Sequence, residues 1–138
     1  MRGIVCDCSV TAAWCLRDES NPQADGVLSL ATEAEFLVPS IWTFEMANVL
    51  VAAERRGRIQ PGDSEKALAA MRRLPLRVVA ADAALPLRLL TLSRSSGLSA
   101  YDAAYLQLAL DEGLPLATLD GELIAAADSV GVAVIPGR

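Results

Sequence analysis

The sequence predicts a single α/β domain over residues 1–138, built on a parallel sheet with helices on both faces. Short apolar runs of roughly four to six residues alternate along the chain with longer segments that have helical spacing. Strands that are apolar throughout are typical of parallel sheets, which are covered on both faces. A length of 138 residues, of which 53% are hydrophobic, suits one domain with a sizeable core.

The expected strands share a run of β-forming apolar residues and lie at residues 3–8, 36–38, 76–79, 116–119 and 132–135. The first, GIVCDC, leads directly into a helix. The second is stopped by Pro39, which cannot donate to a strand ladder. Each of the remaining three follows an expected helix, so the strands run parallel.

The expected helices share apolar spacing of three to four residues and lie at residues 9–16, 21–35, 40–56, 61–73, 82–96, 99–112 and 121–128. Ser40 is expected to cap the third helix, and Gly57 and Gly113 end the third and the sixth. Pro61 and Pro86 fit the first turns of the fourth and fifth helices, where a missing N–H costs nothing.

The composition excludes several classes of function. The chain has no histidine, which excludes Ser-His-Asp and Cys-His catalysis and His-ligated zinc. Three cysteines, Cys6, Cys8 and Cys15, are too few and too crowded for a disulfide framework, so we expect them to pack as small apolar residues. No apolar run is long enough for a membrane span and no signal peptide is evident, which predicts a cytoplasmic protein.

The net charge of −5, from 12 basic and 17 acidic residues, argues against binding nucleic acid by bulk electrostatics. Acidic residues can still meet a polyanion where a divalent metal inverts the local charge. Four acids are candidates for such a site. Asp7 ends the first strand, Asp120 directly follows the fourth, Asp102 stands in the first turn of its helix, and Glu45 lies early in the helix at 40–56. In a parallel sheet these positions meet in one crevice at the carboxyl ends of the strands.

Three of these acids have an alternative, structural interpretation. Asp7 and Asp120 could cap the helices that follow them, and Asp102 could belong to a capping box with Ser99. Glu45 has no basic residue within helical reach and stands between Ile41 and Val49 on an apolar stripe. A carboxylate there is costly unless it is paired, so Glu45 requires a cation from elsewhere in the fold.

Several carboxylates in one crevice repel one another, and one or two divalent cations would compensate. Ligation by oxygen alone favours Mg²⁺ or Mn²⁺ over zinc. Such a site activates water and stabilises charge on a phosphoryl oxygen without histidine.

Four segments, in this order, resemble the PIN-domain family, and more narrowly the VapC-like ribonuclease toxins. They are VCDCS at 5–9, Pro39-Ser40 leading to Glu45-x-x-Asn48, LSAYDA at 98–103 and ATLD at 117–120. The resemblance implies a five-stranded parallel sheet and an acidic metal site of Asp7, Glu45, Asp102 and Asp120. It also implies that Ser9, Asn48 and Thr118 orient the acids or the substrate. The chain departs from many relatives after the last acid, where Gly121, followed by Glu122, stands in place of a basic residue. Glu122 is interpreted as a partner of the helix dipole rather than as a fifth, weaker acid of the site.

The resemblance further implies hydrolysis of RNA, a homodimer and a cognate antitoxin protein. The helix at 40–56 supports a partner chain, because apolar residues such as Trp42, Phe44 and Val51 surround it on more than one face. The alternative is a PIN-like protein that binds RNA or a partner without cleaving it. A receiver domain is disfavoured, because the one lysine, Lys66, lies far from the last strand.

Overall fold

The structure is a computed structural model that describes residues 2–16 and 21–135. Its described strands form one sheet: β1 (Arg2–Cys6), β2 (Ala34–Pro39), β3 (Leu76–Val79), β4 (Leu116–Ala117) and β5 (Val134–Ile135). Their order across the sheet is β3-β2-β1-β4-β5, and every neighbouring pair is parallel. The predicted α/β class and five-stranded parallel sheet are confirmed.

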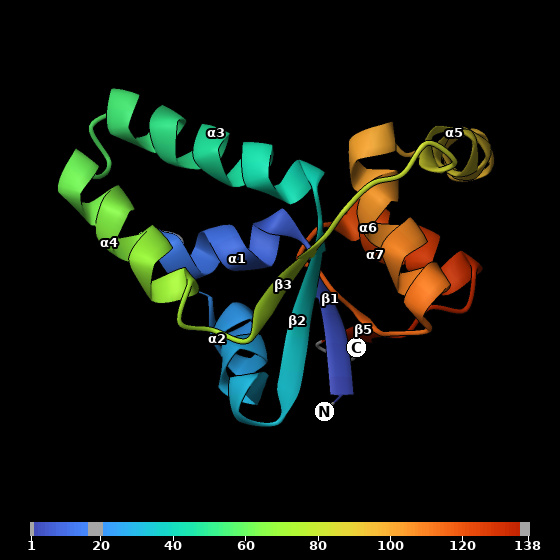
Figure 1. The fold of residues 1–138 in the computed structure, drawn as a ribbon, viewed down its shortest axis with the longest axis horizontal. Coiled ribbons are helices and arrows are strands. Elements are labelled where there is room, and N and C mark those ends of the chain that lie inside the picture. Colours follow the sequence, from blue (N-terminus) through green and yellow to red (C-terminus); the bar gives the residue numbers. More distant parts are fainter. Residues whose placement is uncertain (1, 17–20, 136–138) are drawn as a thin grey trace.

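Helices cover both faces of the sheet, as predicted. They are α1 (Cys8–Cys15), α2 (Pro22–Leu28), α3 (Ile41–Arg55), α4 (Pro61–Met71), α5 (Leu85–Ser96), α6 (Ala100–Glu112) and α7 (Gly121–Ser129). In Figure 1, α1 to α4 lie on one side of the strands and α5 to α7 on the other. Among the described residues, no helix has the length and apolar character needed to cross a membrane.

The order of the strands reverses next to β1, which places a crevice beside it. The chain runs from β1 through β2 to β3 at one edge, then returns to add β4 and β5 on the other side of β1. The junction is closed by the Asp7 N–H, which donates to the carbonyl of Ala117 at 2.9 Å. Ligand sites in open α/β sheets form at such a reversal, outside the carboxyl ends of the strands.

The core is formed by the central strands and the helix faces that cover them. Val5, Phe36 and Val38 are completely buried, and the rings of Trp14 and Phe36 pack with their centroids 5.2 Å apart. Burial also raises the pKa of the Cys6, Cys8 and Cys15 thiols, and all three are free. The prediction that the cysteines pack as small apolar residues is confirmed.

Glycines end two helices where they were predicted to do so. Gly57 follows α3 with φ of 72°, and Gly113 follows α6 with φ of 65°. A side chain with a Cβ is strained in this left-handed region, whereas glycine adopts it freely. The turn at Gly113 leads the chain into β4, which lies beside β1 where the order of the strands reverses.

The predicted helix over residues 21–35 is wrong in its second half. The helix ends at Leu28, a 3₁₀ helix follows at Ser29–Thr32, and β2 already begins at Ala34. The Ser29 hydroxyl donates to the carbonyl of Gly26 at 2.6 Å, which competes with the helical ladder. Pairing with β1 then decides the conformation of the last residues, because Ala34 lies opposite Arg2.

Several smaller features also differ from the prediction: β1 ends at Cys6 rather than at residue 8, and β5 begins at Val134 rather than at residue 132. Ser40 makes no side-chain cap for α3, because its backbone is already helical, with φ of −58° and ψ of −30°. The fifth helix begins three residues after Asp82, whose carboxylate instead accepts the N–H groups of Ala84 and Leu85. The fourth strand ends at Ala117, since the Thr118 side chain turns towards Asp7.

Candidate acidic active site

Asp7 lies at the carboxyl end of β1 and is only 6% exposed. It occupies the position before α1, yet its carboxylate makes no capping hydrogen bond to that helix. Instead its Oδ2 accepts two hydroxyls, from Ser9 at 2.7 Å and from Thr118 at 2.8 Å. The capping interpretation is therefore wrong for Asp7.

Asp120 caps α7 and lies three residues beyond β4 rather than directly after it. Its Oδ1 accepts the N–H groups of Glu122 at 2.9 Å and Leu123 at 3.4 Å. Its own N–H donates to Thr118 Oγ1 at 3.0 Å. Thr118 thus contacts both acids, and the second carboxylate oxygen of Asp120 is left without a hydrogen bond from the described residues.

Asp102 and Glu45 approach from helices on opposite faces of the sheet. Asp102 stands in the first turn of α6, where its N–H donates to Ser99 Oγ at 3.2 Å, so Ser99 caps this helix, as the alternative interpretation of Asp102 has it. Glu45 lies on α3 and is partly buried rather than fully within the core. The phenol of Tyr105 on α6 donates a hydrogen bond to Glu45 Oε1.

The electrostatics place these four acids in one neighbourhood. Burial raises the pKa of Asp7, and the charge of Asp120 adds to the effect, against the hydrogen bonds from Ser9 and Thr118. Burial likewise raises the pKa of Glu45 and of Asp102. The charges of Asp7 and Asp102 raise the pKa of Glu45 further, against the hydrogen bond from Tyr105. The charges of Asp7, Asp120 and Glu122 raise the pKa of Asp102 further, against the hydrogen bond from Ser99. We call Asp7, Glu45, Asp102 and Asp120 the acidic cluster.

Within the part of the chain that the structure describes, the acidic cluster has no basic partner. The ion pairs there join Glu35 to Arg77 at 3.1 Å and Arg88 to Asp111 at 3.0 Å, outside the cluster. No three of the described acids or cysteines lie close enough together to hold a metal ion as the side chains are placed. The donor set nevertheless fits a hard divalent cation, because it consists of carboxylate oxygens that no lysine or arginine among the described residues pairs with.

The residues expected to support the acids fall into two groups. Ser9 and Thr118 contact Asp7 directly, and Ser9 Oγ also accepts the N–H of Leu119 at 3.0 Å. Asn48 is exposed on α3, and its side chain makes no hydrogen bond with the described residues. Glu122, interpreted mainly as a helix-dipole partner, is exposed in the first turn of α7, and its charge acts on Asp102.

Tyr105 was missed by sequence reasoning. It is completely buried, and an aromatic residue in an apolar helix is usually interpreted as core packing. One signal was present in the chain: Tyr105 follows Asp102 by three residues and therefore shares its helix face.

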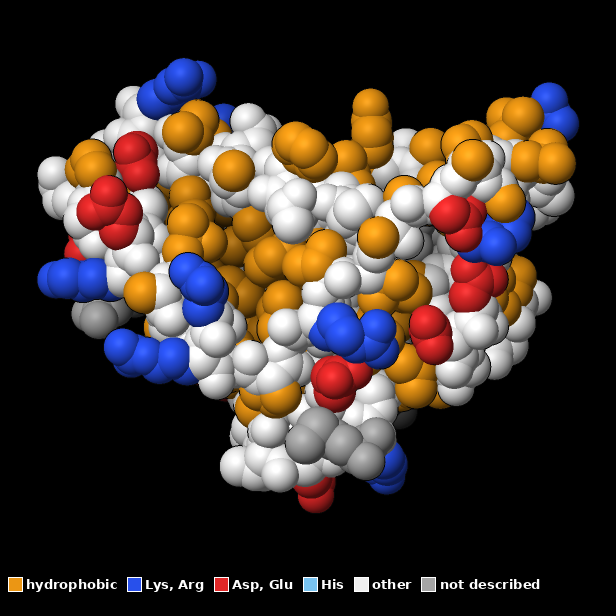
Figure 2. Space-filling view, in the orientation of Figure 1, with side chains coloured by type: hydrophobic (Ala, Val, Ile, Leu, Met, Phe, Trp, Pro, Cys, Tyr) orange, Lys and Arg blue, Asp and Glu red, His pale blue; other side chains and the backbone are white. Residues whose placement is uncertain are grey.

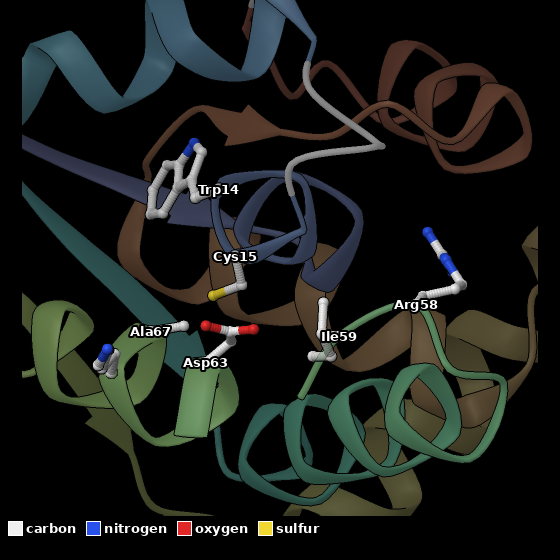
Figure 3. Close-up of a pocket in the computed structure, with 7 residues that line it drawn as sticks. Trp14, Cys15, Arg58, Ile59, Asp63 and Ala67 are labelled. Carbon is white, nitrogen blue, oxygen red and sulfur yellow. The ribbon is translucent and has the colours of Figure 1, made fainter. Parts of the chain in front are cut away.

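Two pockets lie near α1, and one of them is lined in part by Ser9, which donates to Asp7. An open pocket of about 380 Å³ is lined by Cys8, Ser9, Val49 and Leu119 among others, next to Asp7 along the chain. A second, of about 530 Å³, is lined by residues of α1, α4 and the segment that joins α3 to α4 (Figure 3). None of the four acids lines the second pocket, so we place no chemistry there.

Comparisons with known proteins identify the family and the fold. A family model described as the PIN domain matches residues 4–129. No curated protein sequence matches the chain.

Solved structures share the fold at low sequence identity. VapBC2 from Rickettsia felis, bound to a promoter DNA fragment, is 14% identical with a TM-score of 0.70, and 96% of each chain is covered. VapC20 from Mycobacterium tuberculosis, described as a sarcin-ricin loop cleaving toxin, is 19% identical with a TM-score of 0.63, covering 89% of this chain and 94% of that one. FitAcB from Neisseria gonorrhoeae is 20% identical with a TM-score of 0.59, with 96% of each covered. At these identities the likeness establishes the fold alone.

Proposed function

This chain belongs to the PIN domain family, and from that premise we propose that it is a Mg²⁺- or Mn²⁺-dependent endoribonuclease that hydrolyses RNA phosphodiester bonds. One observation carries the proposal. Carboxylates from the end of β1, from α3, from α6 and from the start of α7 act on one another electrostatically at the switch point of the sheet. Among the described residues no lysine or arginine pairs with them, which leaves the site suited to a cation from outside.

The chemistry follows from what each side chain can do. Asp7, Asp102 and Asp120 would hold the cation with the help of Glu45. Once bound, the cation supplies an activated water and stabilises negative charge on the phosphoryl oxygens. Ser9 and Thr118 both donate to Oδ2 of Asp7, so they fix the orientation of that carboxylate.

Thr118 has a second task in this proposal. Because it donates to Asp7 and accepts the N–H of Asp120, it ties the loops after β1 and β4 together. The two carboxylates are thereby held near each other before a cation arrives, at the cost of their mutual repulsion. Such preorganisation is what a metal-dependent hydrolase requires of its ligands.

We propose further that the protein is the toxin of a type II toxin–antitoxin pair, acting in the cytoplasm. A solved structure from Klebsiella pneumoniae that shares its fold is named a toxin–antitoxin complex, and VapC20 is named a toxin. The surface offers room for a partner chain: Phe44 on α3 is 73% exposed and Leu87 on α5 is 68% exposed. In Figure 2, hydrophobic side chains gather along the edge of the molecule that α3 and α5 form. We expect a second protomer or the antitoxin to cover part of this edge.

Cleavage of a mixed RNA pool tests the nuclease directly. The purified protein should cut RNA with Mg²⁺ or Mn²⁺, stop in EDTA, and leave 5′-phosphate ends. If the protein binds RNA but does not cut it at any concentration of either metal, the result would favour the alternative of a binding protein without nuclease activity. Co-purification with the product of a neighbouring small reading frame tests the antitoxin.

A further inference from the structure

Tyr105 is a buried phenol that faces the acidic cluster from α6. It is 0% exposed and lies three residues after Asp102, on the same face of the helix. Burial raises its pKa far above the ordinary value, and the charges of Glu45, Cys8 and Asp7 add to the effect. The phenol O–H is a hydrogen-bond donor towards an anion.

The partner of this donor is Glu45, across the crevice on α3. The Tyr105 O–H donates to Glu45 Oε1, over a sequence separation of 60 residues. Neither side chain makes another side-chain hydrogen bond within residues 2–16 and 21–135. The hydrogen bond therefore links α6 to α3, two helices on opposite faces of the sheet, through the carboxylate of Glu45.

The backbone beneath Glu45 is already held in place by its neighbours. Trp42, one turn earlier, donates from Nε1 to Thr11 Oγ1 at 2.9 Å, and Met46 Sδ lies 3.3 Å from the same hydroxyl. These contacts pack α3 against α1. What remains to be ordered is the Glu45 side chain, which loses rotamer freedom when it is fixed.

We propose that Tyr105 is a positioning residue for the acidic cluster: it holds Glu45 by Oε1 and leaves Oε2 available to a divalent cation. The inference rests on the proposed function, because it assigns Glu45 a ligand role. A purely structural account would make Tyr105 a core residue whose hydroxyl uses the nearest acceptor. The two accounts differ in what removal of one oxygen does to metal affinity.

The test is Tyr105→Phe, which removes the hydroxyl and keeps the ring. Melting temperature is measured against Mn²⁺ concentration, which reports binding without any need for catalysis. We expect the Mn²⁺ concentration at half-maximal shift to rise about 10-fold, as is common when a group that supports a ligand is lost. Tyr101→Phe is the matched control, because Tyr101 is exposed one turn earlier on the same helix, and it should leave the midpoint unchanged.

A double-mutant cycle with Glu45→Gln separates positioning from packing. If Tyr105 acts through Glu45, adding Tyr105→Phe to Glu45→Gln should not raise the Mn²⁺ midpoint further. Equal midpoints for the wild type and Tyr105→Phe would overturn the inference, as would an equal rise in both backgrounds. A wild type that shows neither a Mn²⁺ shift nor RNA cleavage would remove the proposed function together with this role. A wild type that responds normally beside an unaffected Tyr105→Phe would remove the role alone.

Discussion

Addition of Mn²⁺ to the metal-free protein should stabilise the folded state, because the carboxylates of the acidic cluster are partly buried and repel one another without a cation. Burial and mutual repulsion raise the pKa values of Asp7, Glu45 and Asp102, so the charged forms of these acids are disfavoured in the folded state. A cation bound only by the folded state relieves that repulsion and shifts the folding equilibrium. Capping acids alone would show no such response.

The size of the shift follows from two quantities. At ten times its Kd, a ligand that binds only the folded state adds about 1.4 kcal/mol to the free energy of unfolding. Unfolding of 138 residues at about 2 cal/mol/K per residue corresponds to an entropy of about 0.3 kcal/mol/K. The melting temperature should therefore rise by about 5 °C.

The assay is thermal unfolding followed by circular dichroism, with Mn²⁺, with Mg²⁺ and in EDTA. Mn²⁺ should shift the curve at least as far as Mg²⁺ does. Asp7→Asn and Asp120→Asn should each lose most of the shift, whereas Asp25→Asn, which changes an exposed acid on α2, should keep it. A wild-type curve that stays unmoved up to millimolar Mn²⁺ would refute the reasoning, and so would equal shifts in all three variants.

Four further outcomes are expected. Glu45→Gln should slow RNA cleavage strongly without lowering the melting temperature in EDTA, because it removes a repelling charge; full activity with lower stability would contradict a ligand role. In EDTA the free energy of unfolding should rise as pH falls from neutral towards about 4, because raised carboxyl pKa values make the folded state bind more protons; a flat profile would argue against the shifts. Asp120→Ala should unfold with about 1 kcal/mol less free energy than Asp120→Asn, which keeps an acceptor for the α7 N–H groups; equal stabilities would exclude the cap. Phe44→Glu should turn the expected dimer into a monomer in light scattering, and equal masses would place the interface elsewhere.

Much of the fold could be predicted because local signals agree with the tertiary structure. The glycines after α3 and α6 and the apolar runs of the strands act within a few residues of themselves. The helix over residues 21–35 failed because pairing of β2 with β1 outweighs local helical spacing. The parallel direction of the strands followed from the alternation of strands and helices, whereas their order across the sheet was not predicted.

The site could be predicted only where a topological rule applies. Asp7 and Asp120 follow strands, and the carboxyl ends of parallel strands meet at one edge. Glu45 was expected on a core-facing stripe, yet it is partly exposed and reaches a phenol from the opposite face. Its contact with Tyr105 depends on how two helices pack across the sheet, which no local pattern encodes.

The most direct test of the acidic cluster as a nuclease site is the initial rate of RNA cleavage by the wild type and by Asp102→Asn in saturating Mn²⁺. Asp102 makes no side-chain ion pair among the described residues, so its amide variant should fold and melt normally in EDTA. The account predicts that the wild type cleaves in Mn²⁺ and stops in EDTA, and that Asp102→Asn loses most of the rate. Wild-type turnover by folded Asp102→Asn would contradict it.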